Sequence, residues 1–181
     1  MTPRRDSLVA NTYTQIYIQV VFAVKGRAGL ITPAHKEELQ KYIAGIIRNT
    51  KHKLLAINCM PDHTHLFIGM KPDIALSDLV RDIKANSSAF ITRKGWVRGK
   101  FGWQEGYGAF SYAQSQVRTV INYILDQEQH HAQRRFQEEY INLLEEFEIK
   151  FENEYLFEEI KPGPSVSGNS EGIITPKQPK R

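Results

Sequence analysis

The sequence predicts an α+β fold whose core follows the ferredoxin-like order β-α-β-β-α-β, an antiparallel sheet with helices on one face, with C-terminal helices added to it. Three observations lead to this prediction. Four β-rich runs occur along the chain. One run with helical periodicity lies between the first and second of them and another between the third and fourth, and further helical runs follow the fourth strand. The length of 181 residues suits one domain with a buried core.

The first half of this core is predicted within residues 13–70. The β-rich run 13–24 ends at a Lys-Gly pair and is predicted to be a strand. The run 31–50 starts with a threonine N-cap and a proline at the first helical position, and its apolar residues then repeat at helical spacing. Strands are predicted at 52–60 and 63–70, and the Pro-Asp pair between them predicts a hairpin.

The second half of the core and its addition follow from there. A helix is predicted at 76–94 from the apolar residues on one face, and residues 95–108 have the glycine-rich and aromatic composition of a loop. The short run 109–113 is the predicted fourth strand. Two further helices, from about residue 116 to 131 and from about 133 to 147, then complete the chain's regular structure.

Composition bounds the remaining organisation. Residues 1–10 are expected to form a flexible arm, residues 11–158 a single domain, and residues 161–181, rich in proline, glycine and basic residues, a disordered basic tail. The single cysteine, Cys59, excludes an internal disulfide, and we expect it to be a buried strand residue in a protein of the reducing cytoplasm. No apolar run approaches the ~20 residues of a membrane span, so no membrane is expected among its partners. The net charge of +4 favours polyanionic partners.

A pair of histidines begins the strand predicted at 63–70. Side chains alternate between the faces of a strand, so His63 and His65 point the same way and Thr64 points to the opposite face. Their Cα atoms then lie roughly 6.5–7 Å apart, close enough for both imidazoles to bind one ion. Two interpretations stay open for this pair alone: half-exposed surface histidines, or metal ligands.

A tyrosine and a glutamine leave the apolar stripe of the helix predicted at 116–131. A helix turns by 100° per residue, and this rotation places Tyr123 and Gln127 away from the centre of the stripe. The two residues lie one turn apart. The alternatives are a boundary tyrosine with its hydroxyl in water and a solvated glutamine, and His130 and His131 are expected to line the exposed end of the helix. The stripe consists of Val117, Val120, Ile121 and Ile124.

Together these groups could support phosphodiester chemistry. Two neutral imidazoles and a carboxamide oxygen give a mixed N/O site with open positions, suited to Mg²⁺ or Mn²⁺. Such an ion can polarise a phosphodiester oxygen as a Lewis acid. A tyrosine hydroxyl beside it can attack phosphorus and form a phosphotyrosine, provided that it loses a proton whose ordinary pKa is near ~10.

Three segments carry a family resemblance. MPDHTHLF (60–67), GYGAFSY (106–112) and INYILDQEQHH (121–131) together resemble the single-tyrosine HUH transposases of small bacterial insertion sequences, the IS200-like transposases. The likeness extends over about residues 11–158. Since three separate motifs occur in the right order, the resemblance is more specific than any one of them.

The resemblance implies an enzyme and its partners. Such a transposase has a ferredoxin-like catalytic domain, here 11–158, and cleaves and rejoins single-stranded DNA at hairpin ends through a 5′-phosphotyrosine. His63, His65 and Gln127 would bind Mg²⁺ or Mn²⁺, and Tyr123 would be the nucleophile. The family works as homodimers in which the tyrosine helix of one subunit can serve the other's metal site. Thr64 departs from the family pattern, which has a bulky apolar residue there, and we expect it to alter packing more than chemistry.

DNA contacts are expected on a basic segment interleaved with aromatic residues. Such a segment can pair with phosphates and stack bases. The alternative is a solvated helix face followed by a loop that its aromatic residues hold in place. The expected contacts are Arg81, Lys84, Asn86, Arg98 and Lys100, with Arg93, Lys94, Trp96 and Trp103 beside them.

Two rival functions remain open. One is a domesticated relative that processes chromosomal hairpin repeats with the same chemistry. The other is a non-catalytic ferredoxin-like module that binds single-stranded nucleic acid by stacking bases on its sheet. The occurrence of both histidines with the tyrosine and the glutamine favours the enzyme, because a binding module needs none of the four.

Overall fold

The computed structural model describes residues 13–131, 135–152 and 156. The predicted arm 1–10 and tail 161–181 lie outside these residues. The elements follow one another in the predicted order, with two short 3₁₀ helices, η1 (Lys25–Arg27) and η2 (Gln114–Gln116), between them. They are β1 (Ile16–Ala23), α1 (Pro33–Asn49), β2 (Lys53–Cys59), β3 (His63–Met70), α2 (Leu76–Lys94), β4 (Gly108–Tyr112), α3 (Val117–Leu125), α4 (Gln127–His131) and α5 (Phe136–Glu146).

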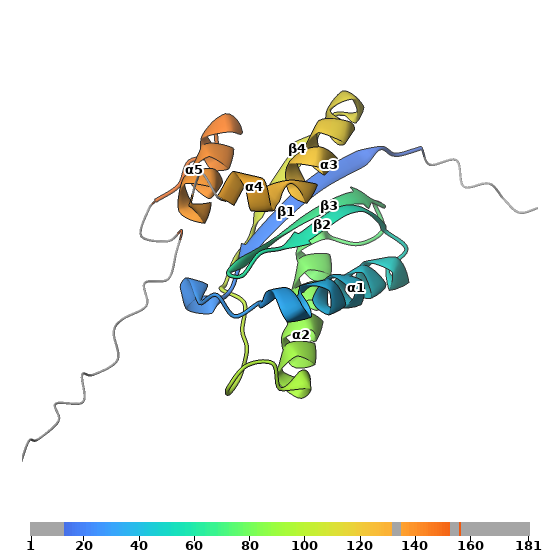
Figure 1. Ribbon diagram of the computed structural model, residues 1–181. Coiled ribbons are helices and arrows are strands. Elements are labelled where there is room, and N and C mark those ends of the chain that lie inside the picture. The colour runs from blue at the N-terminus through green and yellow to red at the C-terminus, as the bar shows by residue number, and fades with distance from the viewer. Residues whose placement is uncertain (1–12, 132–134, 153–155, 157–181) are drawn as a thin grey trace, which may run out of the picture.

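The four strands form one antiparallel sheet in the order β2-β3-β1-β4. β1 and β3 are therefore the central strands, and their register pairs Val21 with His65 and Ala23 with His63. The helices α1 and α2 cover one face of this sheet, whereas α3, α4 and α5 lie on the other side (Figure 1). The ferredoxin-like core with added C-terminal helices is thus confirmed.

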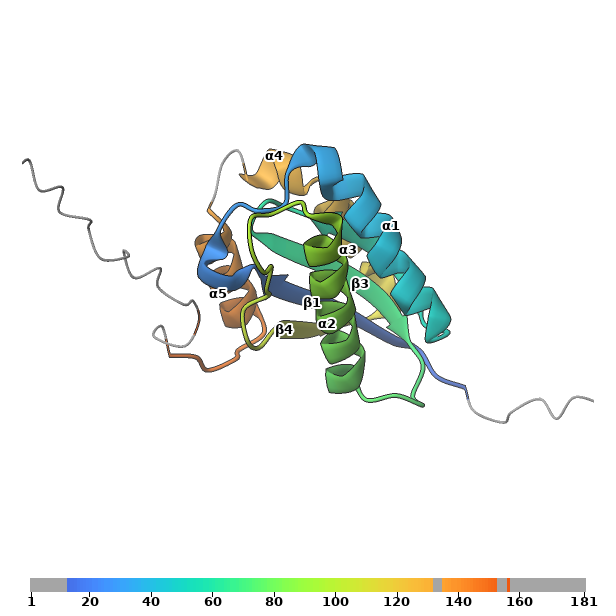
Figure 2. The same cartoon turned by 90° about the horizontal axis from the view of Figure 1, so that it is seen from below.

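The face under α1 and α2 holds the larger apolar core. Alternate residues of the central strands, such as Val20 and Phe22 on β1 and Leu66 and Ile68 on β3, pack against the two helices. Figure 2 shows α1 and α2 side by side across this face. The ring of Phe22 meets Trp103, from the loop before β4, edge to face at 4.7 Å. Burial of these side chains supplies the main driving force for folding of this half.

The opposite face is covered by α3 and α5. The intervening residues of the same strands point here, so Phe67 of β3 packs with Val120 and Ile124 of α3, while Val21 of β1 packs with residues of α5. A side chain in place of Gly108 would come within 2.8 Å of the Tyr140 ring and hydroxyl, so the glycine lets α5 approach β4 closely. The site described below lies between these two helices.

The helix predicted at 116–131 is two helices, so that prediction is wrong. α3 ends at Leu125, Asp126 leaves helical geometry with φ −88° and ψ 13°, and α4 begins at Gln127. The buried amide of Asn58 on β2 donates to the carbonyl of Ile124 at 2.9 Å and to that of Leu125 at 3.4 Å. These bonds from a distant strand stabilise the break, because they satisfy carbonyls at the end of α3.

The other predicted elements agree with the structure. The bounds predicted for β3 and α2 are confirmed at both ends, and the remaining ends differ by one to three residues. Among the residues that the structure describes, no helix is both long and apolar enough to cross a membrane.

Candidate active site

The two histidines lie at the start of β3. His63 is 1% exposed and His65 is 0% exposed, and their ring centroids lie 5.0 Å apart, so the interpretation as half-exposed surface residues is wrong. Thr64, the residue between them, is also buried. It lies opposite Cys59 and Phe22 in the sheet and faces the α1/α2 side. The strand alternation therefore places both imidazoles on one face, as predicted, and this is the face covered by α3 and α5.

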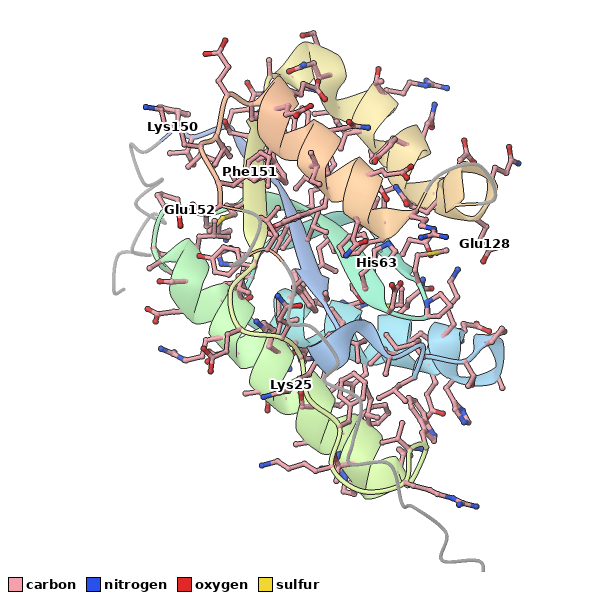
Figure 3. All side chains as sticks on the ribbon, turned by 90° about the vertical axis from the view of Figure 1, so that its left-hand side faces the viewer. Lys25, His63, Glu128, Lys150, Phe151 and Glu152 are labelled. Carbon is pink, nitrogen blue, oxygen red and sulfur yellow. The ribbon has the colours of Figure 1, made fainter. Side chains whose placement is uncertain are left out.

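Each imidazole has its Nδ1 atom beside a fixed polar group. Nδ1 of His63 lies 2.7 Å from Asp62 Oδ1, and Nδ1 of His65 lies 3.2 Å from Nε2 of Gln19. The His63 ring also stacks on Phe136 of α5, with centroids 3.9 Å apart, and Figure 3 shows His63 at the side of that helix. Because Nδ1 is engaged in both rings, Nε2 is the atom with which each could bind a metal.

Tyr123 reaches the histidines from the last turn of α3. Its ring centroid lies 6.3 Å from that of His65, and its hydroxyl donates a hydrogen bond to Glu139. Burial and the negative charge of Glu139 raise the pKa of Tyr123 far above its ordinary value. In this arrangement the phenol is neutral, so a nearby positive charge would be needed to make it a nucleophile at neutral pH.

Gln127 is the first residue of α4 and is 0% exposed, so the solvated alternative is wrong. Its Nε2 donates to Glu139 Oε1 at 2.9 Å. Its Oε1 atom is buried and has no hydrogen-bond partner within the part of the chain that the structure describes. A buried acceptor of this kind is costly unless something satisfies it, and a cation would do so.

Glu139 on α5 belongs to the site, although it is not among the residues predicted from the sequence. Its Oε1 accepts hydrogen bonds from Tyr123 and Gln127 and lies 3.5 Å from His65 Nε2. His63, His65 and Glu139 each offer one ligand atom, and these atoms lie within 4.8 Å of one another. One signal could have found it: Glu139 falls three residues after Phe136 and four before Leu143, inside the buried stripe of the helix.

The donor set fits a divalent cation. Two imidazole nitrogens, one carboxylate and one carboxamide oxygen form a mixed N/O set with one negative charge, which suits a divalent cation and differs from the thiolate-rich sites that bind softer metals. The one cysteine does not take part: Cys59 is buried, and its burial raises the pKa of its thiol to about 12.

The predicted DNA-binding residues of α2 do not join this site. Arg81 is exposed and pairs with Asp78 at 2.6 Å and with Asp82 at 3.1 Å. Lys84 donates to the carbonyls of Gln104 and Gly106, and burial lowers the pKa of its ammonium group. Asn86 donates to the carbonyl of Asp82 at 2.7 Å. All three lie on the helix that covers the opposite face of the sheet, so their contact with DNA stays a prediction.

Two tryptophans of the loop after α2 pack against neighbouring side chains of the protein. The indole N–H of Trp103 donates to Ser87 at 2.9 Å, and the Trp96 ring stacks on His35 with centroids 4.4 Å apart. These contacts favour the alternative in which aromatic residues hold the loop in place. Arg98 and Lys100 are exposed and remain predicted DNA contacts. The side chains of His130 and His131 lie outside what the structure describes.

A comparison with protein families matches the IS200-like transposases over residues 12–127. A sheet of ferredoxin-like order with this match defines the class as DNA transposases, and the chain belongs to the IS200-like transposase family. The match ends at Gln127, so α5 and Glu139 lie beyond it. Their place in the site rests on the geometry of this chain.

Two solved structures share the fold. One is a candidate transposase from Deinococcus radiodurans R1, with 20% identity and a TM-score of 0.53 over 65% of this chain and 94% of that one. The other is a REP-associated tyrosine transposase bound to a REP hairpin, with 18% identity and a TM-score of 0.52 over 72% of this chain and 74% of that one. At such identities the likeness concerns the fold. No curated protein matches the sequence.

Proposed function

We propose that the protein is a metal-dependent transposase that cleaves and rejoins single-stranded DNA at hairpin-bearing ends through a covalent 5′-phosphotyrosine on Tyr123. One observation carries this proposal. Two histidines of β3 and, some sixty residues later, a tyrosine and a glutamine from two helices converge on one buried site in a chain of the IS200-like transposase family. Convergence of distant, chemically matched residues is what a catalytic site requires.

The metal would be held by His63, His65, Gln127 and Glu139. The imidazoles would use Nε2, because Nδ1 of each is engaged, and Gln127 would use its buried Oε1 atom. When bound, Mg²⁺ or Mn²⁺ supplies Lewis-acid charge to the scissile phosphate. Asp62 beside His63 fits the pattern of a carboxylate that orients a ligating histidine.

Tyr123 would attack the phosphorus. The phenol oxygen forms a bond to phosphorus, the bond from phosphorus to the 3′ oxygen breaks, and the proton given up by the phenol is balanced by the proton gained by the new 3′-hydroxyl. Glu139 orients this oxygen, since it accepts the hydrogen bond of the Tyr123 hydroxyl. The new ester bond conserves the energy of the broken one, so the reverse attack by a 3′-hydroxyl rejoins the strand without ATP.

Hairpin DNA is the proposed partner. The REP-associated transposase that shares the fold is bound to a hairpin, and the net charge of +4 suits a polyanion. We further propose residues 11–158 as the catalytic domain and a homodimer as the working form. A domesticated relative that processes hairpin repeats would use the same site, and subterminal hairpins in the DNA around the gene would favour the mobile element.

The structure favours the enzyme over the non-catalytic module. A base-stacking platform requires an open face of the sheet. Here α1 and α2 cover one face, and α3 and α5 pack on the other through two apolar clusters (Figure 1). The sheet therefore offers no open platform within the described residues, and the buried polar site has no use in such a module.

The test is covalent capture of DNA. Incubated with end-labelled single-stranded hairpin DNA and Mn²⁺ or Mg²⁺, the protein is expected to form an adduct that survives a denaturing gel. Tyr123→Phe and EDTA should each abolish it. Tyr42→Phe is the matched control, because Tyr42 of α1 stacks on Phe90 of α2 and a phenylalanine retains that contact. An adduct that persists in Tyr123→Phe would refute the nucleophile, and one that persists in EDTA would refute the metal.

A further inference from the structure

A glutamine lies in the middle of the central strand, in the otherwise apolar run IYIQVVFA. Gln19 is 0% exposed and is flanked across the sheet by Phe67 on one side and Phe110 on the other. An apolar side chain would fill this position without a polar group to satisfy, since a buried amide costs free energy unless it is hydrogen-bonded. Packing therefore gives no reason for a glutamine here.

The contacts of Gln19 lead to the candidate site. Gln19 is diagonal to His65 in the pairing of β1 with β3, and its Nε2 lies 3.2 Å from His65 Nδ1. Its Oε1 accepts a hydrogen bond of 2.8 Å from the hydroxyl of Tyr112 on β4. Burial raises the pKa of Tyr112 well above its ordinary value, so the hydroxyl keeps its proton. One polar line thus crosses three strands, from His65 through Gln19 to Tyr112.

This line bears on which nitrogen of His65 carries the proton. In a neutral imidazole one ring nitrogen carries a proton and the other has a lone pair. The hydrogen-bond partner of Nδ1 therefore decides whether Nε2 carries the proton or presents the lone pair. A carboxamide can serve either case, because a half-turn exchanges its oxygen and nitrogen. The orientation described above has the amide nitrogen toward His65. After the half-turn the oxygen faces His65, Nδ1–H donates to Gln19, and the Gln19 amide donates to the oxygen of Tyr112, so both contacts are kept.

We propose that Gln19 is a positioning residue for the metal site: its carboxamide oxygen holds the proton of His65 on Nδ1 and so directs the Nε2 lone pair to the ion. The inference rests on the metal site of the proposed function. Asp62 has the same task at His63, but a carboxylate only accepts, whereas the Gln19 carboxamide can present its oxygen to His65 and keep its contact with Tyr112, because the Tyr112 hydroxyl can accept as well as donate. The two histidines thus have different hydrogen-bond partners at Nδ1, and the partner of His65, Gln19, is the one buried in the sheet.

The first test is Mn²⁺ binding to the full chain, measured by titration calorimetry without DNA. Gln19→Met keeps the length of the side chain and removes the acceptor, and we expect it to weaken Mn²⁺ binding about 10-fold or more. Gln19→Glu should bind Mn²⁺ like the wild type, because its oxygens accept from both His65 and Tyr112. Gln104→Met is the matched control: Gln104 is also buried, but its amide donates to the carbonyl of Leu156, and its loss should leave Mn²⁺ affinity unchanged.

The second test reads the proton directly. ¹⁵N NMR of the imidazoles in the Mg²⁺-loaded wild type should show His65 protonated on Nδ1 and bare on Nε2, an observation that needs no variant to fold. A proton on Nε2, or wild-type Mn²⁺ affinity in Gln19→Met, would overturn the inference. Neither readout needs cleavage of DNA: if Mn²⁺ binds as expected and no adduct forms, the proposed function fails and the role of Gln19 stands.

Discussion

The two faces of the sheet bury different chemistry. Under α1 and α2 the buried side chains form one apolar cluster, and a small polar residue such as Ser87 is bonded to a helix carbonyl and to Trp103. Under α3 and α5 the apolar residues form two smaller clusters. Buried polar and charged side chains gather between them, namely Gln19, Asn58, His63, His65, Gln127 and Glu139.

This difference separates stability from function. A face that buries mostly apolar surface gains free energy with each contact, whereas a face that buries imidazoles, amides and a carboxylate gives up part of that gain to desolvation. The site face is therefore expected to contribute less to the free energy of unfolding and more to activity. The following substitutions test that division.

The largest effect on stability is expected from Phe22→Ala on the α1/α2 face. Phe22 is buried, and its removal leaves a cavity beside Trp103, so the free energy of unfolding should fall by about 3–5 kcal/mol. Urea denaturation measures the loss. Phe22→Leu, which fills most of the space, should cost about 1 kcal/mol. Metal affinity, measured where both variants remain folded, should not change; a parallel loss of Mn²⁺ binding would show that the two faces are not independent.

The sequence was sufficient for the α1/α2 half because its signals are local. Helical spacing, an N-cap and a hairpin turn act over a few residues, and the bounds of β3 and α2 agree with the structure. The break between α3 and α4 could not be found in this way. It depends on Asn58 of β2, some sixty-six residues before the carbonyl of Ile124 that it binds.

The site, too, was predictable only where local patterns determine it. The strand alternation was enough to put His63 and His65 on one face, and the helical angle was enough to separate Tyr123 and Gln127 from the apolar stripe. What brings the two pairs together is the folding of α3 and α5 onto the sheet, which no short-range pattern encodes. Glu139 was missed for that reason: its significance lies in what α5 packs against.

An intermediate effect, on function alone, is expected from Glu139→Gln. The glutamine keeps the shape and the acceptor for Tyr123 but removes the charge, so Mn²⁺ affinity measured by calorimetry should fall about 10- to 100-fold. The free energy of unfolding should change by less than about 1 kcal/mol, or rise, because a buried carboxylate is costly to desolvate. The neighbouring exposed residue supplies the control, Glu138→Gln, which should change neither quantity. Unaltered Mn²⁺ affinity in Glu139→Gln would remove Glu139 from the ligand set.

The smallest effect is expected from Arg81→Ala, which asks whether the α1/α2 face contributes to DNA binding at all. The guanidinium is exposed and is already paired with Asp78 and Asp82, so its loss should change stability by under about 1 kcal/mol. Because the two carboxylates repel a phosphate, the affinity for hairpin DNA, measured by fluorescence anisotropy, should fall only about two- to threefold. The slope of the logarithm of the binding constant against the logarithm of the salt concentration should decrease in magnitude by less than about one. Lys41→Ala, which removes an exposed, ion-paired charge from α1, is the matched control. A tenfold loss confined to Arg81→Ala would place α2 in the main DNA interface, and wild-type affinity in both variants would leave the α1/α2 face a scaffold for the site on the other side.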